Sequence, residues 1–149
     1  MKKTFLKNKK NIQFLIIGLG LIGGSVAKRL SKNGFEILAI EKNKSHLNHA
    51  KILNGGLEKI DSTKKLFVIV ALPPKILLRN FDKYLKLFHK ADFVTDCTSV
   101  KGSLLNKIKK NKLESKFILS HPIAGSEKSG FMNSNEDLFR NRISIISKH

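Results

Sequence analysis

The sequence predicts an α/β fold in which helices cover both faces of a parallel sheet. Short apolar runs typical of buried parallel strands alternate along the chain with segments of helical periodicity. A glycine-rich turn over residues 18–23 joins the first of these strands to the first helix. At 149 residues the chain is long enough for one domain, which we expect at residues 12–149 after a basic arm at residues 1–11.

The first half of the chain supplies two pairs of a strand and a helix. A mostly apolar run that ends in glycine predicts the first strand, and apolar residues on one side followed by Gly34 predict the first helix. Ser45 is a typical N-cap residue, and Gly55-Gly56 ends the helix that it begins. The expected elements are strands at residues 12–17 and 35–40 and helices at residues 21–33 and 45–53.

The second half continues the alternation after residues 57–65, which show no clear pattern. The run Leu-Phe-Val-Ile-Val-Ala-Leu predicts a strand that Pro73-Pro74 closes, and the next helix carries apolar residues on one face as far as residue 89. The expected strands of this half are residues 66–72, 93–96, 116–120 and 143–147, with a further helix at residues 102–110.

The net charge of +18 has two interpretations. A basic surface can bind a polyanion such as nucleic acid. However, only four of the 29 basic residues are arginine, and the lysines are scattered rather than gathered in one stripe. The chain is also rich in Asn, Ile and Phe, a bias typical of AT-rich coding sequence. We therefore favour a compositional origin and do not expect a nucleic-acid partner.

Cysteine usage and hydropathy favour a cytoplasmic protein. The single cysteine, Cys97, excludes an internal disulfide framework and belongs to no metal-ligand pattern, so no metal is expected. Residues 1–24 resemble a basic and apolar signal peptide, but their apolar run contains the glycine pattern and continues as a helix. No apolar run is long enough to span a bilayer, and no membrane partner is expected.

The glycine-rich turn and a later carboxylate predict a dinucleotide site of Rossmann type. Gly-x-Gly-x-x-Gly between a strand and a helix lets the pyrophosphate approach free amide groups at the helix N-terminus. Glu41 ends the second strand, where a carboxylate binds ribose hydroxyls and disfavours a 2′-phosphate, so NAD is expected; Lys42 and Lys44 argue the other way. The alternative is a structural turn with a surface acid. The expected cofactor residues are Gly18, Gly20, Leu21, Ile22, Gly23, Glu41, Leu72 and Pro73.

A histidine and a serine follow two neighbouring strands of the predicted sheet. His121 precedes a proline after the strand at residues 116–120, and Ser99 follows the strand at residues 93–96. Ligands of open α/β sheets bind at the carboxyl ends of the strands. A neutral imidazole there can take a proton from a substrate hydroxyl as a hydride leaves the same carbon, and Ser99 can orient the ring. The alternative is a loop histidine and a helix-capping serine.

Two charged residues near this pair are further candidates. Lys101 can neutralise a carboxylate or orient the cofactor, or it can be a solvated lysine at a helix start. Glu127 can gate the pocket through an ionic link, or it can be a solvated surface acid.

Three motifs together resemble the prephenate dehydrogenase family. They are Gly18-Leu-Gly-Leu-Ile-Gly-Gly-Ser25, Asp96-Cys-Thr-Ser-Val-Lys101 and His121-Pro-Ile-Ala-Gly-Ser-Glu-Lys-Ser-Gly130. The resemblance runs over residues 12–147. Other Rossmann dehydrogenases share the glycine turn but not the other two motifs in this order.

The resemblance implies an NAD-dependent oxidative decarboxylation of prephenate to 4-hydroxyphenylpyruvate, on the route to tyrosine. It gives His121 the role of proton acceptor for the ring hydroxyl, with Ser99 orienting it and contacting the same hydroxyl. The matching positions Lys101, Ser126 and Glu127 support the substrate pocket. In this family a helical domain follows, forms the homodimer and supplies an arginine for the substrate carboxylate, and the sequence carries no counterpart of it.

Other functions remain open from the sequence alone. The chain resembles the nucleotide-binding and partly catalytic half of the enzyme, and homodimer formation would require the helical domain. Arogenate dehydrogenase or another Rossmann reductase is the enzymatic alternative. The non-enzymatic alternatives are a truncated, inactive NAD-binding module and a basic nucleotide-sensing or nucleic-acid-binding module.

Overall fold

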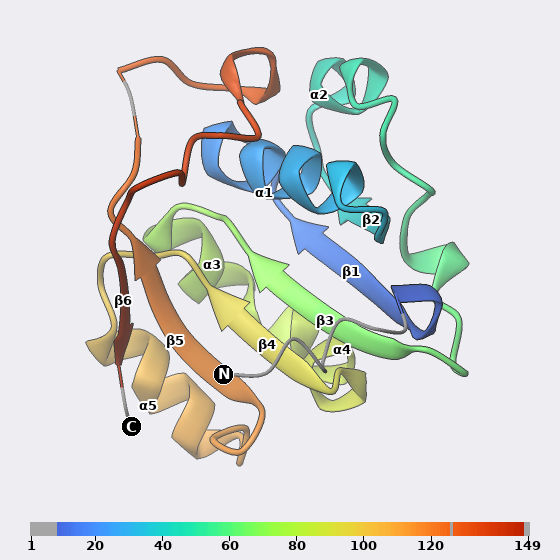
Figure 1. Ribbon diagram of the computed structural model, residues 1–149. Helices are drawn as coiled ribbons and strands as arrows, with labels where there is room; N and C mark the ends of the chain where they lie inside the picture. The colour runs from blue at the N-terminus through green and yellow to red at the C-terminus, as the bar shows by residue number, and fades with distance from the viewer. Residues whose placement is uncertain (1–8, 126, 148–149) are drawn as a thin grey trace.

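The computed structural model describes residues 9–125 and 127–147 as one six-stranded sheet flanked by helices (Figure 1). The strand order is β2-β1-β3-β4-β5-β6. In Figure 1, α1 and α2 lie on one side of the sheet, and α3, α4 and α5 lie on the other. The strands are β1 (Ile12–Ile17), β2 (Glu36–Ile40), β3 (Lys65–Val70), β4 (Phe93–Asp96), β5 (Phe117–Pro122) and β6 (Ser144–Ser147).

The helices follow the predicted alternation, with two corrections. The first is that Asn43, rather than Ser45, caps the helix expected at residues 45–53, which ends at His49. The α-helices are α1 (Leu21–Lys32), α2 (Lys44–His49), α3 (Pro74–Asn80), α4 (Leu85–Lys90) and α5 (Gly102–Lys110), with short 3-10 turns η2 (Lys9–Asn11), η3 (Leu57–Lys59), η4 (Phe81–Tyr84) and η5 (Phe131–Asn133). The second is that the single helix expected after β3 is wrong, because η4 separates α3 from α4. Asn80 Nδ2 donates to the Ile76 carbonyl at 2.8 Å, a local bond that competes with helix continuation.

The last strand corrects the expectation of a fully parallel sheet. The other five strands are parallel, but β6 runs antiparallel to β5, with His121 opposite Ile145. A parallel neighbour would need a crossover back to the start of β5. Instead the connection stays at the carboxyl end of β5, where η5 packs on α1 and the Asn135 N–H donates to Ser25 Oγ at 2.9 Å.

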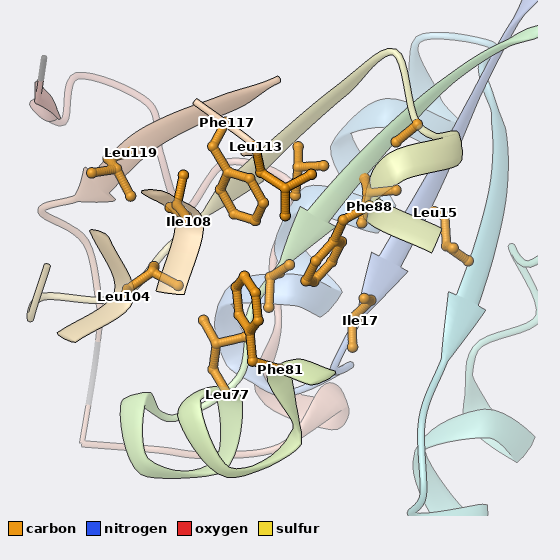
Figure 2. Packing of buried hydrophobic residues seen from close by; sticks show 14 of the residues in the cluster. Leu15, Ile17, Leu77, Phe81, Phe88, Leu104, Ile108, Leu113, Phe117 and Leu119 are labelled. Atoms are coloured by element: carbon orange, nitrogen blue, oxygen red, sulfur yellow. The ribbon is translucent and has the colours of Figure 1, made fainter. Parts of the chain in front are cut away.

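Two apolar clusters hold the sheet between its helix layers. The larger cluster lies under α3, α4 and α5 and centres on three buried rings, of which Phe88 lies 5.3 Å from Phe81 and 5.2 Å from Phe117 between centroids (Figure 2). The smaller cluster joins the opposite face of β1 and β2 to Ala27 of α1 and Phe131 of η5. Helices therefore cover both faces of the sheet, as expected.

The start of the chain differs in part from the expected loose arm. Residues 9–11 form η2, and Lys9 Nζ donates to the Asn33 carbonyl at 2.6 Å and lies over the Phe35 ring. The rest of the expected arm, residues 1–8, lies outside the described residues. Within the described part of the chain, no helix is long and apolar enough to cross a membrane.

Candidate nucleotide-binding and catalytic site

The carboxyl ends of the parallel strands bring the predicted site residues to one edge of the sheet. The glycine turn follows β1, Glu41 follows β2, Leu72 follows β3 and Ser99 follows β4, while His121 is the second-last residue of β5. This is the edge at which open α/β sheets bind their ligands. The gathering of these residues is what the alternation of strands and helices predicts.

Two glycines of the turn are required by the fold itself. Gly18 has φ +94°, and a Cβ there would lie 2.7 Å from the Ala71 carbonyl oxygen. A Cβ on Gly23 would lie 1.9 Å from the Gly18 carbonyl oxygen. Neither position can hold a side chain, because backbone atoms fill the space.

Gly20 differs from these two, because open space surrounds it. A Cβ on Gly20 would meet no atom within 4 Å, and Gly20 is the extended N-cap of α1. Leu21 and Ile22 follow in the first turn, whose backbone N–H groups lack partners within the helix. The bare backbone and the free amides fit an approaching pyrophosphate.

Glu41 links the end of β2 to the glycine turn. Its Oε2 accepts the Leu19 N–H at 2.6 Å, and its Oε1 accepts the Asn43 N–H at 2.8 Å. Burial opposes ionisation, but the bonds from Asn43 and Leu19, together with His46, lower the pKa of Glu41 below its ordinary value. The carboxylate is therefore ionised and held in place, while Lys42 and Lys44 are exposed.

Leu72 and Pro73 complete the predicted cofactor set on the far side of β1. Leu72 lines a narrow cavity of about 90 Å³ with Gly18, Glu41 and Tyr84. Pro73 is the N-cap of α3. Two residues of its lining, Gly18 and Glu41, are among those expected to bind the dinucleotide.

His121 has one ring nitrogen held by the backbone. Its Nδ1 lies 3.3 Å from the Cys97 carbonyl oxygen. A carbonyl only accepts, so Nδ1 carries the hydrogen and Nε2 of the neutral ring keeps its lone pair. His121 also lines a cavity of about 370 Å³ with Pro122, Ile123 and Arg142 among its walls.

The expected hydrogen bond from Ser99 to His121 is not formed. Ser99 is exposed, and within residues 9–125 and 127–147 its side chain makes no hydrogen bond. The Cys97 carbonyl occupies the position that we expected the Ser99 hydroxyl to take. The reason is the tight turn after β4, in which Asp96 Oδ2 accepts both the N–H and the hydroxyl of Thr98.

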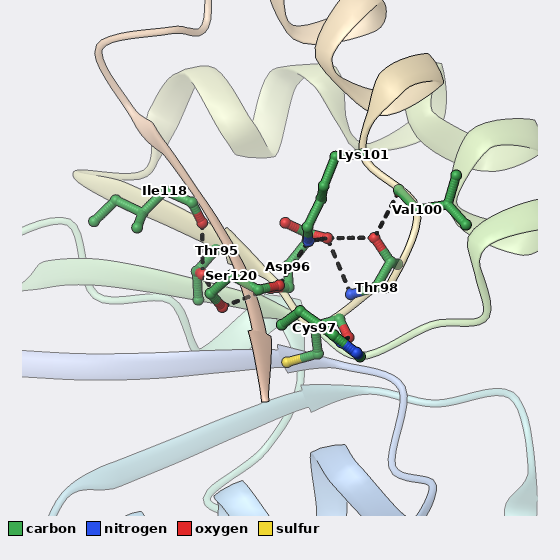
Figure 3. Close-up of polar contacts among 9 residues, drawn as sticks. Thr95, Asp96, Cys97, Thr98, Val100, Lys101, Ile118 and Ser120 are labelled. Atoms are coloured by element: carbon green, nitrogen blue, oxygen red, sulfur yellow. Dashed lines mark hydrogen bonds and ion pairs between the residues drawn. The ribbon is translucent and has the colours of Figure 1, made fainter. Parts of the chain in front are cut away.

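Lys101 forms a buried ion pair with Asp96 that fixes this turn (Figure 3). Its Nζ donates to Asp96 Oδ2 at 2.5 Å and to the Ser120 carbonyl at 2.6 Å. The Asp96 side chain is fully buried, and that of Lys101 is 19% exposed. Ser120 Oγ also donates to the Asp96 carbonyl at 2.7 Å. Lys101 therefore joins the end of β4 to the residue before His121, and it is not the solvated lysine of the alternative.

Glu127 forms no hydrogen bond or ion pair with His121 in the described part of the chain. Glu127 is exposed, and Ser126 lies outside the described residues. Burial first, and then the charge of Asp96, raise the pKa of Cys97 to about 12, so its thiol is not a nucleophile at neutral pH. Within the described ranges, no group of three or more His, Cys, Asp or Glu could hold a metal ion.

Sequence reasoning missed four contributors to this site. The Cys97 carbonyl is a backbone group with no sequence signature, and Arg142 lies far from His121 along the chain. Asp96 and Thr98 had a usable signal, because an Asp two residues before a Thr at a strand end is typical of a side-chain-stabilised turn.

Replacing Lys101 tests the buried ion pair. In Lys101→Met the buried Asp96 carboxylate loses its counter-ion, and we expect the free energy of unfolding to fall by about 3 kcal/mol in urea at neutral pH. The matched control is Lys32→Met, whose pair with Glu136 is solvent-exposed and should contribute less than about 1 kcal/mol. Adding Asp96→Asn to Lys101→Met should recover part of the loss. Equal losses in both lysine variants would contradict the assignment.

Comparisons with known proteins agree with this geometry. The family model "Prephenate dehydrogenase, nucleotide-binding domain" matches residues 26–148. The prephenate dehydrogenase of Lactococcus lactis is 32% identical over 146 residues, which cover 91% of this chain and 41% of that protein. The chain thus spans about two fifths of the length of this curated relative.

Two solved structures share the fold. Prephenate dehydrogenase from A. aeolicus, in complex with hydroxyphenyl propionate and NAD+, superposes with a TM-score of 0.73 at 30% identity, over 92% of this chain and 50% of that one. Arogenate dehydrogenase from Synechocystis superposes with a TM-score of 0.74 at 25% identity and the same coverage. The family model covers most of the chain, and the chain therefore belongs to the prephenate dehydrogenase family.

Proposed function

We propose that this chain binds NAD along the carboxyl edge of its sheet and accepts a substrate proton on His121 during oxidation of prephenate. The observation that carries the proposal is the bond from His121 Nδ1–H to the Cys97 carbonyl, which leaves Nε2 as an acceptor. Membership of the prephenate dehydrogenase family, a family of NAD-dependent dehydrogenases, supports the reaction class.

The described residues fit a dinucleotide. Gly20 and the first amides of α1 would hold the pyrophosphate, and Leu72 would contact the dinucleotide beside Gly18. Glu41 is ionised and keeps lone pairs for ribose hydroxyls, and its charge would repel a 2′-phosphate. The A. aeolicus relative, solved with NAD+, supports NAD as the nucleotide.

His121 performs the proton transfer of the proposed reaction. Bound NAD would supply the hydride acceptor. The substrate hydroxyl gives its proton to His121 Nε2 as a hydride leaves the same ring carbon, and loss of carbon dioxide then makes the ring aromatic. Because the Cys97 carbonyl holds Nδ1–H, the imidazolium that forms keeps its orientation. The exposed hydroxyl of Ser99, in the same loop as Cys97, is free to contact the substrate hydroxyl.

Arogenate is a second candidate substrate, favoured by the equal structural similarity of the Synechocystis arogenate dehydrogenase. The two substrates share the ring and its hydroxyl and differ in the side chain. The contacts proposed for His121 serve both substrates. Parallel assays with each substrate therefore decide between them.

Replacing Gly20 tests the nucleotide site without disturbing the fold. Gly20→Ala meets no atom of the protein, so we expect unchanged stability without ligand. Its methyl group would obstruct the pyrophosphate and weaken NAD binding about tenfold. At NAD concentrations near 100 times the Kd, the stabilisation by NAD would then fall from about 2.7 to about 1.4 kcal/mol.

The matched control for this test is Gly102→Ala, at the equally open start of α5. Thermal unfolding with and without NAD is the measurement. Unchanged stabilisation of Gly20→Ala by NAD would contradict the proposed position of the pyrophosphate.

Replacing His121 tests the proton transfer. His121→Asn keeps a polar side chain but removes the Nε2 acceptor, so we expect NADH formation from prephenate to fall by about 10²–10⁴. NAD affinity should stay unchanged, because His121 lies outside the proposed dinucleotide contacts. Assays with arogenate and with NADP run in parallel. Full activity of His121→Asn, or no turnover by the unsubstituted chain while it binds NAD, would contradict the proposed activity.

A further inference from the structure

One positively charged side chain that no sequence motif indicated lines the cavity beside His121. Arg142 lines this cavity of about 370 Å³ together with His121 and the residues that directly follow it. Lys101, the cation that the sequence places near His121, cannot serve a ligand, because its Nζ is bound to Asp96 and to the Ser120 carbonyl. Any negative charge of a molecule bound at His121 must therefore find a different partner.

The backbone holds Arg142 in its place across from the loop after β5. The Ile123 N–H donates to the Ile143 carbonyl at 2.8 Å, which continues the β5–β6 pairing one step beyond the strands. A turn directly precedes this pairing, because Asn141 has φ +55° and the Arg142 N–H donates to the Phe139 carbonyl at 3.2 Å. Asn adopts this conformation more readily than most residues. Arg142 therefore lies between the turn and the paired residue Ile143.

The Arg142 guanidinium has no competing partner within the described ranges, because no ion pair or side-chain hydrogen bond involves it. Two of the other arginines, Arg29 and Arg140, both contact Asp137 Oδ1, at 3.1 and 4.0 Å. Guanidinium donors match a carboxylate in a two-bonded geometry that a lysine cannot reproduce. An unpaired arginine in a cavity with a proton-accepting histidine is suited to a hydroxy acid.

We propose that Arg142 binds the carboxylate of a substrate whose ring hydroxyl contacts His121. This inference rests on the proposed function of His121 and deepens it by naming a residue of this chain that binds the substrate's carboxylate. The chain thereby holds a carboxylate partner of its own, within the same domain as the proton acceptor. Arg142 is a specificity-determining residue in this assignment, because it selects the charge of the ligand.

Two ligands that differ by one carboxylate group test this assignment without requiring turnover. Hydroxyphenyl propionate carries a ring hydroxyl and a carboxylate, and para-ethylphenol has the same ring without the carboxylate. Calorimetry measures the affinity of each for the full chain, with and without NAD. We expect the unsubstituted chain to bind hydroxyphenyl propionate roughly tenfold more tightly.

Three variants complete the test. In Arg142→Gln the affinity ratio of the two ligands should fall to about one, with the affinity for para-ethylphenol unchanged. The matched control is Arg140→Gln, two residues earlier, whose side chain contacts Asp137 and does not line the cavity. This control should keep the tenfold ratio. Arg142→Lys should keep only part of it, because one ammonium cannot bind a carboxylate in the two-bonded geometry.

Several outcomes would overturn the assignment. They are an affinity ratio that Arg142→Gln leaves unchanged, an equal loss for both ligands in that variant, and an unsubstituted chain that binds neither ligand. The NAD titration separates this proposal from the proposed function. If the chain prefers hydroxyphenyl propionate but does not bind NAD, the dinucleotide site is contradicted and the carboxylate site is supported. If the chain binds NAD but does not prefer hydroxyphenyl propionate, the carboxylate site is contradicted and the dinucleotide site is supported.

Discussion

The buried ion pair between Asp96 and Lys101 is the interaction on which the site depends. A fully buried carboxylate is costly unless a cation and hydrogen bonds compensate it. Here Lys101 and Thr98 both bind Asp96 Oδ2, while Oδ1 has no hydrogen-bond partner within the described residues. The same lysine reaches the Ser120 carbonyl on the next strand. This single arrangement therefore fixes the turn after β4, the end of β5 and the position of the Cys97 carbonyl beside His121.

The site residues form two units along the carboxyl edge of the sheet. At the ends of β1 and β2, the Glu41 carboxylate accepts a hydrogen bond from the glycine turn. The carboxylate that would bind the ribose is therefore ionised and held in place before the nucleotide binds. The ends of β4 and β5 form the second unit, around His121. η5 packs on α1, and the chain that continues from it to β6 supplies Arg142 to the cavity of the second unit.

Much of this could be predicted from the sequence because its signals are local. The bounds of β1, β4 and α5 follow from apolar runs and their flanking residues, and the glycine turn and Glu41 follow from spacing. The direction of β6 could not be predicted, because it depends on the docking of residues 131–137 on α1. The hydrogen bond between His121 and the Cys97 carbonyl could not be predicted, because every residue has a backbone carbonyl. The hydroxyl of Ser99 was the expected partner, because it is the nearby side chain that can form such a bond.

The tautomer of His121 is the measurement that tests the central claim most directly. Nitrogen-15 NMR of the histidine side chains distinguishes a hydrogen on Nδ1 from one on Nε2 in the neutral ring. We expect the hydrogen on Nδ1, held by the Cys97 carbonyl, with Nε2 free to take a proton. A ring with its hydrogen on Nε2, or one that exchanges freely between both forms, would contradict the claim that the fold prepares His121 as a proton acceptor.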